Sequence, residues 1–163
     1  MNDIIAKISS YDIFTNLIPG AVFVFFLSVT GIYTVDAESV VGNLVIYYFT
    51  GLIISRIGSV FVEPVLKLFG IIKYNSYSDF ITASAKDAKI LVLLEASNLF
   101  RAILALLLVC LLTLSWDYVA VVVVLAPRTW GLIALGCLLL LFLLAYRKQN
   151  EFIRKRVEHH KDQ

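Results

Sequence analysis

The stretch TWGLIALGCLLLLFLLAY, residues 129–146, contains no charged residue and approaches the roughly 20 residues that a helix needs to cross a bilayer. Three further runs are mostly apolar and bounded by charge: residues 17–35, 40–60 and 99–116. We therefore predict an all-α polytopic bundle of four transmembrane helices in a single membrane domain. The composition agrees, because a soluble domain with 60% hydrophobic and 16% charged residues could not cover its surface.

The cations are distributed unequally between the two predicted sides of the membrane. If four spans place both termini on one side, that side receives 13 of the 14 Lys and Arg residues, and only Arg128 falls on the other. Basic loops stay in the cytoplasm. We therefore expect a membrane protein with cytoplasmic N- and C-termini. The basic tail at residues 147–163 is expected to lie on anionic lipid, so the charge gives no reason to invoke nucleic acid.

Residues 1–16 carry apolar side chains at mostly three- and four-residue spacing, which predicts an amphipathic helix lying at the cytoplasmic interface. Pro19 and Gly20 follow it. Because proline is best tolerated in the first turn of a helix, we expect a hinge at this pair, where the chain bends into the bilayer. An ordinary interfacial helix and an elbow that docks a partner both fit the pattern.

Small side chains recur at four-residue spacing in the second run, at Gly51, Ser55 and Ser59. They would align on one helix face and let another helix approach closely. The contact could be intramolecular or the seam of a homo-oligomer. Arg56 lies near the cytoplasmic end of the run, where it could snorkel to the headgroups, line an inner vestibule or pair with Glu63.

The cytoplasmic segment, residues 61–98, has helical signals. Glu63-Pro64 can start a short helix and Gly70 can end it, while Ser76 and Asp79 fit a capping box. No proline or glycine follows until Pro127, so one helix could run from there directly into the third span. Its exposed apolar stretch would need cover from another protein, a second copy or the N-terminal helix. The candidate partner-binding residues are Lys86, Lys89, Ile90, Leu93 and Leu94.

Catalytic motifs are missing from the sequence. It has no Gly-rich phosphate loop, no His-Glu-x-x-His, no serine elbow and no Cys-x-x-Cys, so we expect no enzyme, no cofactor and no metal site. Cys110 and Cys137 fall near the middle of the third and fourth runs and are expected to behave as small apolar residues. A proton-coupled transporter would need an ionisable residue deep in the membrane, and the runs contain none at mid-depth.

Several short segments stand out between Tyr11 and Arg101, a region of a little over half of the chain: YDIF (11–14), LIPG (17–20), GLIISRIGS (51–59), EP (63–64), YSDF (77–80) and KD (86–87). With these segments the region resembles a group of small bacterial inner-membrane proteins of anti-phage defence operons, of the Kiwa membrane-subunit type. The resemblance implies a homo-oligomer that works with a cytoplasmic partner and senses infection or perturbs the membrane. It carries no catalytic motif.

Two hypotheses of different class follow. In the first, the chain is an oligomeric inner-membrane defence component whose segment 61–98 binds a soluble protein and transmits a change through the third span. In the second, it is a passive anchor or scaffold for a cytoplasmic enzyme. Small-molecule transport is the least favoured of the alternatives.

Overall fold

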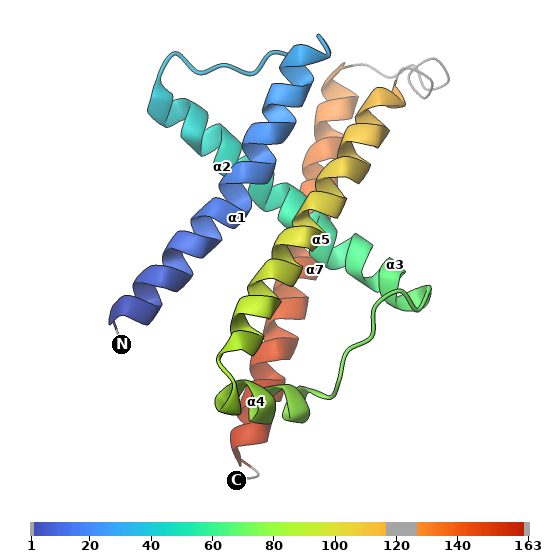
Figure 1. The fold of residues 1–163 in the computed structure, drawn as a ribbon. Helices are drawn as coiled ribbons and strands as arrows, with labels where there is room; N and C mark the ends of the chain where they lie inside the picture. The colour runs from blue at the N-terminus through green and yellow to red at the C-terminus, as the bar shows by residue number, and fades with distance from the viewer. Residues whose placement is uncertain (1, 117–126, 162–163) are drawn as a thin grey trace.

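The computed structural model describes residues 2–116 and 127–161, and every element in those ranges is helical, as predicted. In Figure 1 the N-terminal end of α1 and the C-terminal end of α7 both lie in the lower half of the molecule, on the side of α4. The elements are α1 (Asn2–Val29), α2 (Val40–Ile57), the π-helical turn η1 (Gly58–Val62), α3 (Glu63–Leu68), α4 (Tyr77–Lys86), α5 (Lys89–Leu114) and α7 (Pro127–Lys161).

Among the described residues, three helical segments are long and apolar enough to cross a membrane: Val40–Leu68, Lys89–Leu114 and Thr129–Arg154. They correspond to the last three predicted runs. The first run lies mostly in the C-terminal half of α1, where the apolar stretch Thr15–Val29 is shorter than these three segments. The structure thus supports three transmembrane helices by length and composition.

Two glycines in the left-handed region end helices. Gly31 has φ +68° after α1 and Gly70 has φ +70° after α3. At each, the next N–H bonds a carbonyl five residues back, from Ile32 to Leu27 and from Ile71 to Leu66. This is the Schellman arrangement, which satisfies the last carbonyls of a helix. The predicted stop at Gly70 is confirmed.

The prediction of a hinge between an interfacial helix and a first span requires a correction. The chain forms one helix, α1, from Asn2 to Val29, with Pro19 inside it. Pro19 is fully buried and Gly20 lies against α2, so the pair serves as a packing contact. The side chains of the predicted amphipathic stripe lie almost entirely outside the described residues.

α1 and α2 cross at two glycines with their backbones in contact. A Cβ placed on Gly20 would overlap the carbonyl of Tyr47, and one on Gly51 would overlap the carbonyl of Asn16. No side chain can occupy either position unless the helices separate. The Gly51 contact is therefore intramolecular, one of the two roles that the sequence left open.

α4 and α5 are separate helices, which corrects the prediction of one continuous helix. The predicted cap is present, since Asp79 N–H donates to Ser76 Oγ at 3.1 Å and α4 begins at Tyr77. The chain breaks at Asp87, whose Oδ1 accepts from Lys89 N–H at 2.9 Å. A short acidic side chain competes for backbone donors in this way and interrupts a helix without proline or glycine.

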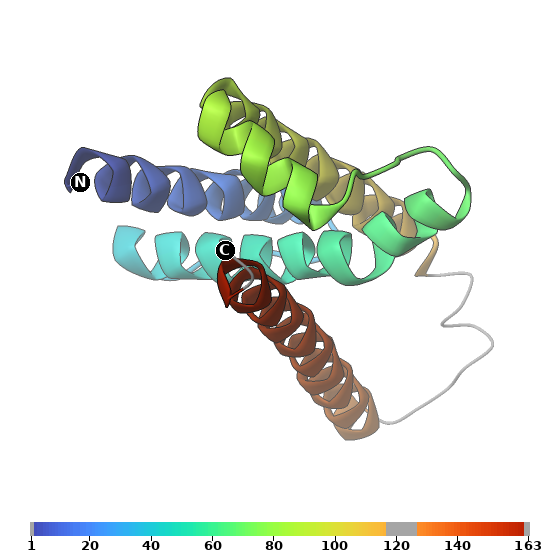
Figure 2. The ribbon, with the colours of Figure 1, turned by 90° about the horizontal axis from the view of Figure 1, so that it is seen from below.

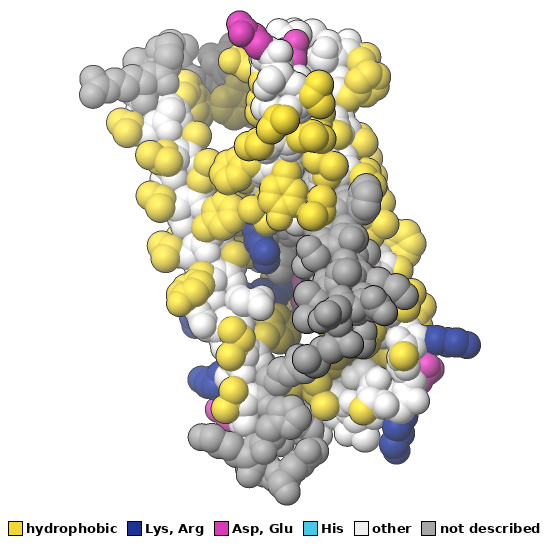
Figure 3. Space-filling view, turned by 90° about the vertical axis from the view of Figure 1, so that its left-hand side faces the viewer, with side chains coloured by type: hydrophobic (Ala, Val, Ile, Leu, Met, Phe, Trp, Pro, Cys, Tyr) yellow, Lys and Arg dark blue, Asp and Glu magenta, His cyan; other side chains and the backbone are white. Residues whose placement is uncertain are grey.

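The small core lies where α5 packs on α2 and η1. It contains Ile54, Val62, Ala105 and Leu106. α7 contributes little to it, and only Leu141 among its described apolar side chains is buried. Figure 2 shows α7 diverging from the group formed by α1, α2 and α5. The apolar side chains that remain exposed cover much of the face drawn in Figure 3, as expected for a surface that meets lipid or protein.

Candidate functional site: an ion cluster beside a π-turn

η1 joins α2 to α3 through a π-turn, in which an N–H bonds the carbonyl five residues back. The N–H of Glu63 donates to Gly58 and so bypasses Ser59. The next residue, Pro64, has no N–H. The Ser59 carbonyl therefore lacks a main-chain donor at both the α and the π spacing. A proline ring also clashes with the carbonyl four residues before it, which explains why the helix widens here.

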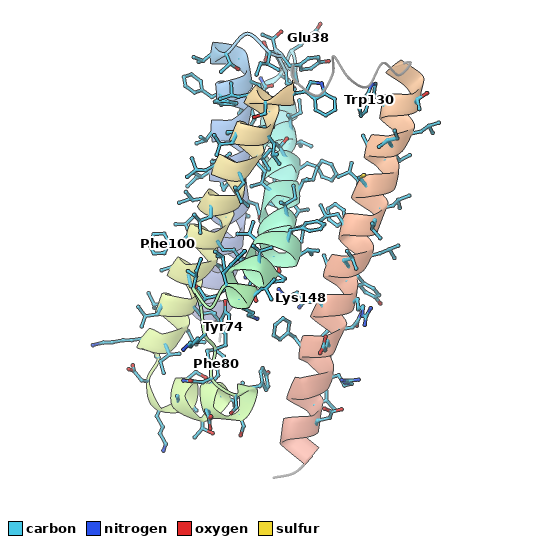
Figure 4. All side chains as sticks on the ribbon, turned by 90° about the vertical axis from the view of Figure 1, so that its right-hand side faces the viewer. Glu38, Tyr74, Phe80, Phe100, Trp130 and Lys148 are labelled. Atoms are coloured by element: carbon cyan, nitrogen blue, oxygen red, sulfur yellow. The ribbon has the colours of Figure 1, made fainter. Side chains whose placement is uncertain are left out.

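Lys148 supplies the missing donor from α7. Its Nζ donates to the Ser59 carbonyl at 2.7 Å and to Ser59 Oγ at 3.0 Å. The third bond, at 2.9 Å, goes to Glu63 Oε2. An ammonium has three N–H donors, so these contacts use all of them. Figure 4 shows Lys148 projecting from α7 toward the other helices.

Glu63 is the acceptor shared by three cations from three helices. Arg101 Nη1 on α5 lies 2.7 Å from Glu63 Oε2, the oxygen that also accepts from Lys148. Lys67 Nζ on α3 lies 3.0 Å from Oε1 and also stacks over the ring of Tyr74, 4.3 Å from its centroid. With one carboxylate and three cations, the cluster has a formal charge of +2.

The carboxylate is the most buried member of the cluster. The Glu63 side chain is 6% exposed, against 24% for Arg101, 28% for Lys148 and 47% for Lys67. A buried carboxylate costs several kcal/mol unless it is paired and hydrogen-bonded, and the three cations meet that requirement. The cluster therefore joins α3, α5 and α7 through a single side chain.

Gly58 allows α5 to come close enough for this arrangement. A Cβ on Gly58 would lie 3.1 Å from the Arg101 carbonyl and 3.3 Å from Ala105 Cβ. Both distances are shorter than ordinary van der Waals contact, so the missing side chain sets the separation between η1 and α5. The turn of α5 that carries Arg101 therefore lies against η1, and the Arg101 side chain can reach Glu63.

A pair of tryptophans marks the opposite end of the bundle. The Trp116 and Trp130 rings meet edge to face, with their centroids 4.9 Å apart. Along α7, Trp130 and Lys148 are separated by about 27 Å, close to the thickness of the hydrocarbon layer. Tryptophan and lysine both favour the membrane interface. The spacing supports a bilayer with the tryptophan pair at one boundary and the ion cluster at the other.

The predicted stripe of small residues does not form a single seam. Gly51 contacts α1, whereas Ser59 bonds Lys148 of α7. Ser55 lies between them, partly buried, and its carbonyl accepts from the N–H of Gly58. The shift from α to π geometry after Ile57 changes which face the later residues present.

The predicted pairing of Arg56 with Glu63 requires a correction. Among the described residues, the ion-pair partners of Glu63 are Lys67, Arg101 and Lys148. Sequence reasoning identified Glu63 but missed all three of its partners, of which Arg101 and Lys148 are distant in the sequence. One signal could have found them, because Arg101 and Lys148 are cations at the basic ends of the third and fourth runs and Glu63 follows the basic end of the second.

The candidate partner-binding residues lie at the turn from α4 to α5. Lys86, Lys89, Leu93 and Leu94 are exposed, and Ile90 is partly buried. Lys86 ends α4 and the other four belong to the part of α5 that precedes Arg101, so these residues lie beyond the ion cluster and away from the tryptophan pair. No group of three or more metal-ligating side chains occurs among the residues whose side chains are described.

Comparison of the chain with models of protein families, with curated proteins and with solved structures gives no match. The functional argument therefore rests on the helices and the ion cluster.

Proposed function

We propose that this chain is an oligomeric subunit of the bacterial inner membrane, with four spans and cytoplasmic termini, that binds a soluble protein in anti-phage defence. The resemblance of segments between Tyr11 and Arg101 supports the defence role. The positions of the N-terminal end of α1 and the C-terminal end of α7 in Figure 1 support the even number of spans. Thirteen of 14 cations on one side support the orientation.

The observation that carries the proposal is an exposed apolar surface on the side of the ion cluster that faces away from the tryptophan pair. Leu91, Val92 and Leu93 precede Arg101 on α5 and are all exposed, Leu93 by 67%. If the cluster lies at the membrane boundary, these side chains project into the cytoplasm, where exposed apolar surface marks a protein contact. The basic residues Lys86 and Lys89 beside them favour a partner with an acidic rim.

Photo-cross-linking in cells tests the proposal. A photoreactive phenylalanine at Leu93 is expected to form an adduct with one soluble protein and, at lower yield, with a second copy of the chain. The matched control is Leu143, an equally exposed leucine on the membrane-spanning part of α7, which should give no adduct with a soluble protein. Equal adducts at both sites, or none at Leu93, would contradict partner binding.

Phage challenge tests the defence role separately. In cells that carry the chain with its neighbouring genes, Leu93→Ser is expected to abolish protection while the protein remains in the membrane. Ile71→Ser changes another exposed apolar residue, in the turn after α3, and is expected to retain protection. A cross-link at Leu93 without any effect on infection would retain the partner and remove the defence role.

A further inference from the structure

An apolar groove runs between α2 and α7 on the membrane-spanning part of the molecule. Its volume is about 360 Å³. Every residue that lines it is apolar, including Ile53, Ile57 and Phe61 on one wall and Cys137, Leu138 and Leu141 on the other. α7 diverges from the other helices in Figure 2, so no further helix covers the groove between α2 and α7. Something apolar must therefore fill the groove in the membrane.

The ion cluster lies at the basic end of the same groove. Lys148 follows Leu141 by seven residues, which is two helical turns and about 10 Å, so both lie on the same side of α7. On the other wall, Ser59 lies between the lining residues Ile57 and Phe61. The groove thus leads from hydrocarbon depth directly to a cluster with a formal charge of +2.

We propose that the groove and the cluster together form a binding site for an anionic phospholipid. One acyl chain occupies the groove between α2 and α7, and the headgroup phosphate lies against Arg101 and Lys67 in the field of Lys148. Arg101 has five N–H donors and gives one of them to Glu63, and Lys67 is 47% exposed. Charged donors bond phosphate strongly, and basic pockets between membrane helices hold acidic headgroups.

Charge favours lipid over a second copy of the chain as the occupant. A copy docked symmetrically in this groove would bring an identical cluster of charge +2 against the first, and like charges at an interface are costly. An anionic phospholipid supplies both the apolar chain and the missing negative charge. This inference goes beyond the proposed function, because it holds whether or not a soluble partner binds at Leu93.

Lipid binding to the full chain in detergent, followed by native mass spectrometry, tests the proposal. The probes are phosphatidylglycerol and phosphatidylcholine with identical acyl chains. Both lipids carry a phosphate, but the choline cation neutralises it in phosphatidylcholine, so only phosphatidylglycerol is anionic. At about fivefold per cation near an anionic headgroup, the net charge of two predicts that phosphatidylglycerol binds about 25-fold more tightly. Equal affinity for the two lipids would overturn the proposal.

Two pairs of variants separate the headgroup contact from the groove. Lys148→Gln is expected to reduce the preference for phosphatidylglycerol about fivefold, whereas the neighbouring Arg147→Gln should leave it nearly unchanged. Cys137→Phe fills the groove without changing charge and should abolish tight binding. Leu139→Phe adds an aromatic ring at an exposed position outside the groove lining and should not.

Further outcomes decide the source of the phosphate and the occupant. Inorganic phosphate in excess should not displace phosphatidylglycerol, and displacement would show that the cluster takes a free anion and that the groove is not used. If Cys137→Phe lowers the oligomer mass and leaves lipid binding intact, the groove is a protein interface and the lipid site is wrong. Cross-linking at Leu93 is measured in the same variants. If lipid binding is lost and the cross-link to the soluble partner is retained, the lipid site and the partner site are independent, and each proposal can fail without the other.

Discussion

α2 makes two contacts that differ in kind. Toward α1 it presents Gly51, and the two backbones meet with no side chain between them. Toward α7, the continuation of the same rod presents a carbonyl and a carboxylate to Lys148. The first contact depends on shape alone, and the second depends on charge and on a carbonyl freed by a π-turn. The contact with α1 therefore requires two backbones to fit closely, whereas the contact with α7 requires a charged side chain to find its polar partners.

Adding a methyl group at Gly51 is expected to give the largest effect. In Gly51→Ala the new Cβ would overlap the Asn16 carbonyl, so α1 must move away. We expect the free energy of unfolding to fall by about 3 kcal/mol, the upper part of the range for overpacking. Equilibrium unfolding in mixed detergent micelles measures it.

Gly136→Ala is the matched control. Gly136 lies in α7 with nothing within 4 Å of the added methyl group. Alanine favours a helix over glycine, so this change should stabilise the protein by up to about 1 kcal/mol. If the two variants behave alike, the glycine contact between α1 and α2 is not what holds these helices together.

Removing the charge of Glu63 is expected to give the next largest effect. Glu63→Gln leaves Arg101, Lys148 and Lys67 without their carboxylate. Breaking a fully buried pair costs several kcal/mol, and because these cations are a quarter to a half exposed we expect about 2 kcal/mol here. The same unfolding measurement applies.

Glu158→Gln controls for the loss of an acidic charge. Glu158 pairs with Arg154 on the surface of α7 at 3.5 Å, and both side chains are exposed. Surface pairs of this kind contribute at most about 0.5 kcal/mol. A loss for Glu158→Gln as large as that for Glu63→Gln would mean that the ion cluster holds α7 no better than a surface ion pair.

The same contrast explains which features could be predicted from the sequence. The Ser76 cap of α4 was predictable because donor and acceptor lie three residues apart. The long helices were predictable from the apolar runs, because run length and hydropathy are properties of contiguous residues. Two of the three partners of Glu63 were not predictable in this way, because Arg101 is 38 and Lys148 is 85 residues away, whereas Lys67 lies four residues along the same helix. Their meeting depends on how three helices pack.

Two local features were also misjudged. Pro19 suggested a hinge, yet the surrounding packing of α1 on α2 buries the ring and keeps the helix continuous. Asp87 interrupts the helix before the third span through a side-chain bond that no proline or glycine announces. In both cases a tertiary or side-chain contact outweighs the backbone preference from which the prediction was made.

The tryptophan pair provides a smaller test at the other end of α7. Trp130→Ala removes the edge-to-face contact with Trp116, which joins α7 to the end of α5. Such pairs contribute about 1 kcal/mol beyond their buried area. We expect a destabilisation near that value and loss of the tryptophan exciton couplet in the far-ultraviolet circular dichroism. Trp130→Phe keeps a ring in place and should retain most of the stability, and a full loss there would argue against a ring contact.

A double-mutant cycle between Pro64 and Lys148 sharpens the comparison further. Pro64→Ala restores an N–H that can bond the Ser59 carbonyl, either at the π spacing or by returning Glu63 N–H to it in a regular α-helix. The hydrogen bond from Lys148 to this carbonyl then contributes less to stability, because a main-chain N–H satisfies the same acceptor. We expect Lys148→Gln to cost less in the Pro64→Ala background, with a coupling of about 0.5 to 1 kcal/mol.

Pro64→Ala combined with Trp130→Ala, which changes the distant end of α7, should be additive. Because Pro64 and Lys148 share the Ser59 carbonyl, additivity in both cycles would show that the freed carbonyl does not contribute to holding Lys148, which would then be held by Glu63 and Ser59 Oγ.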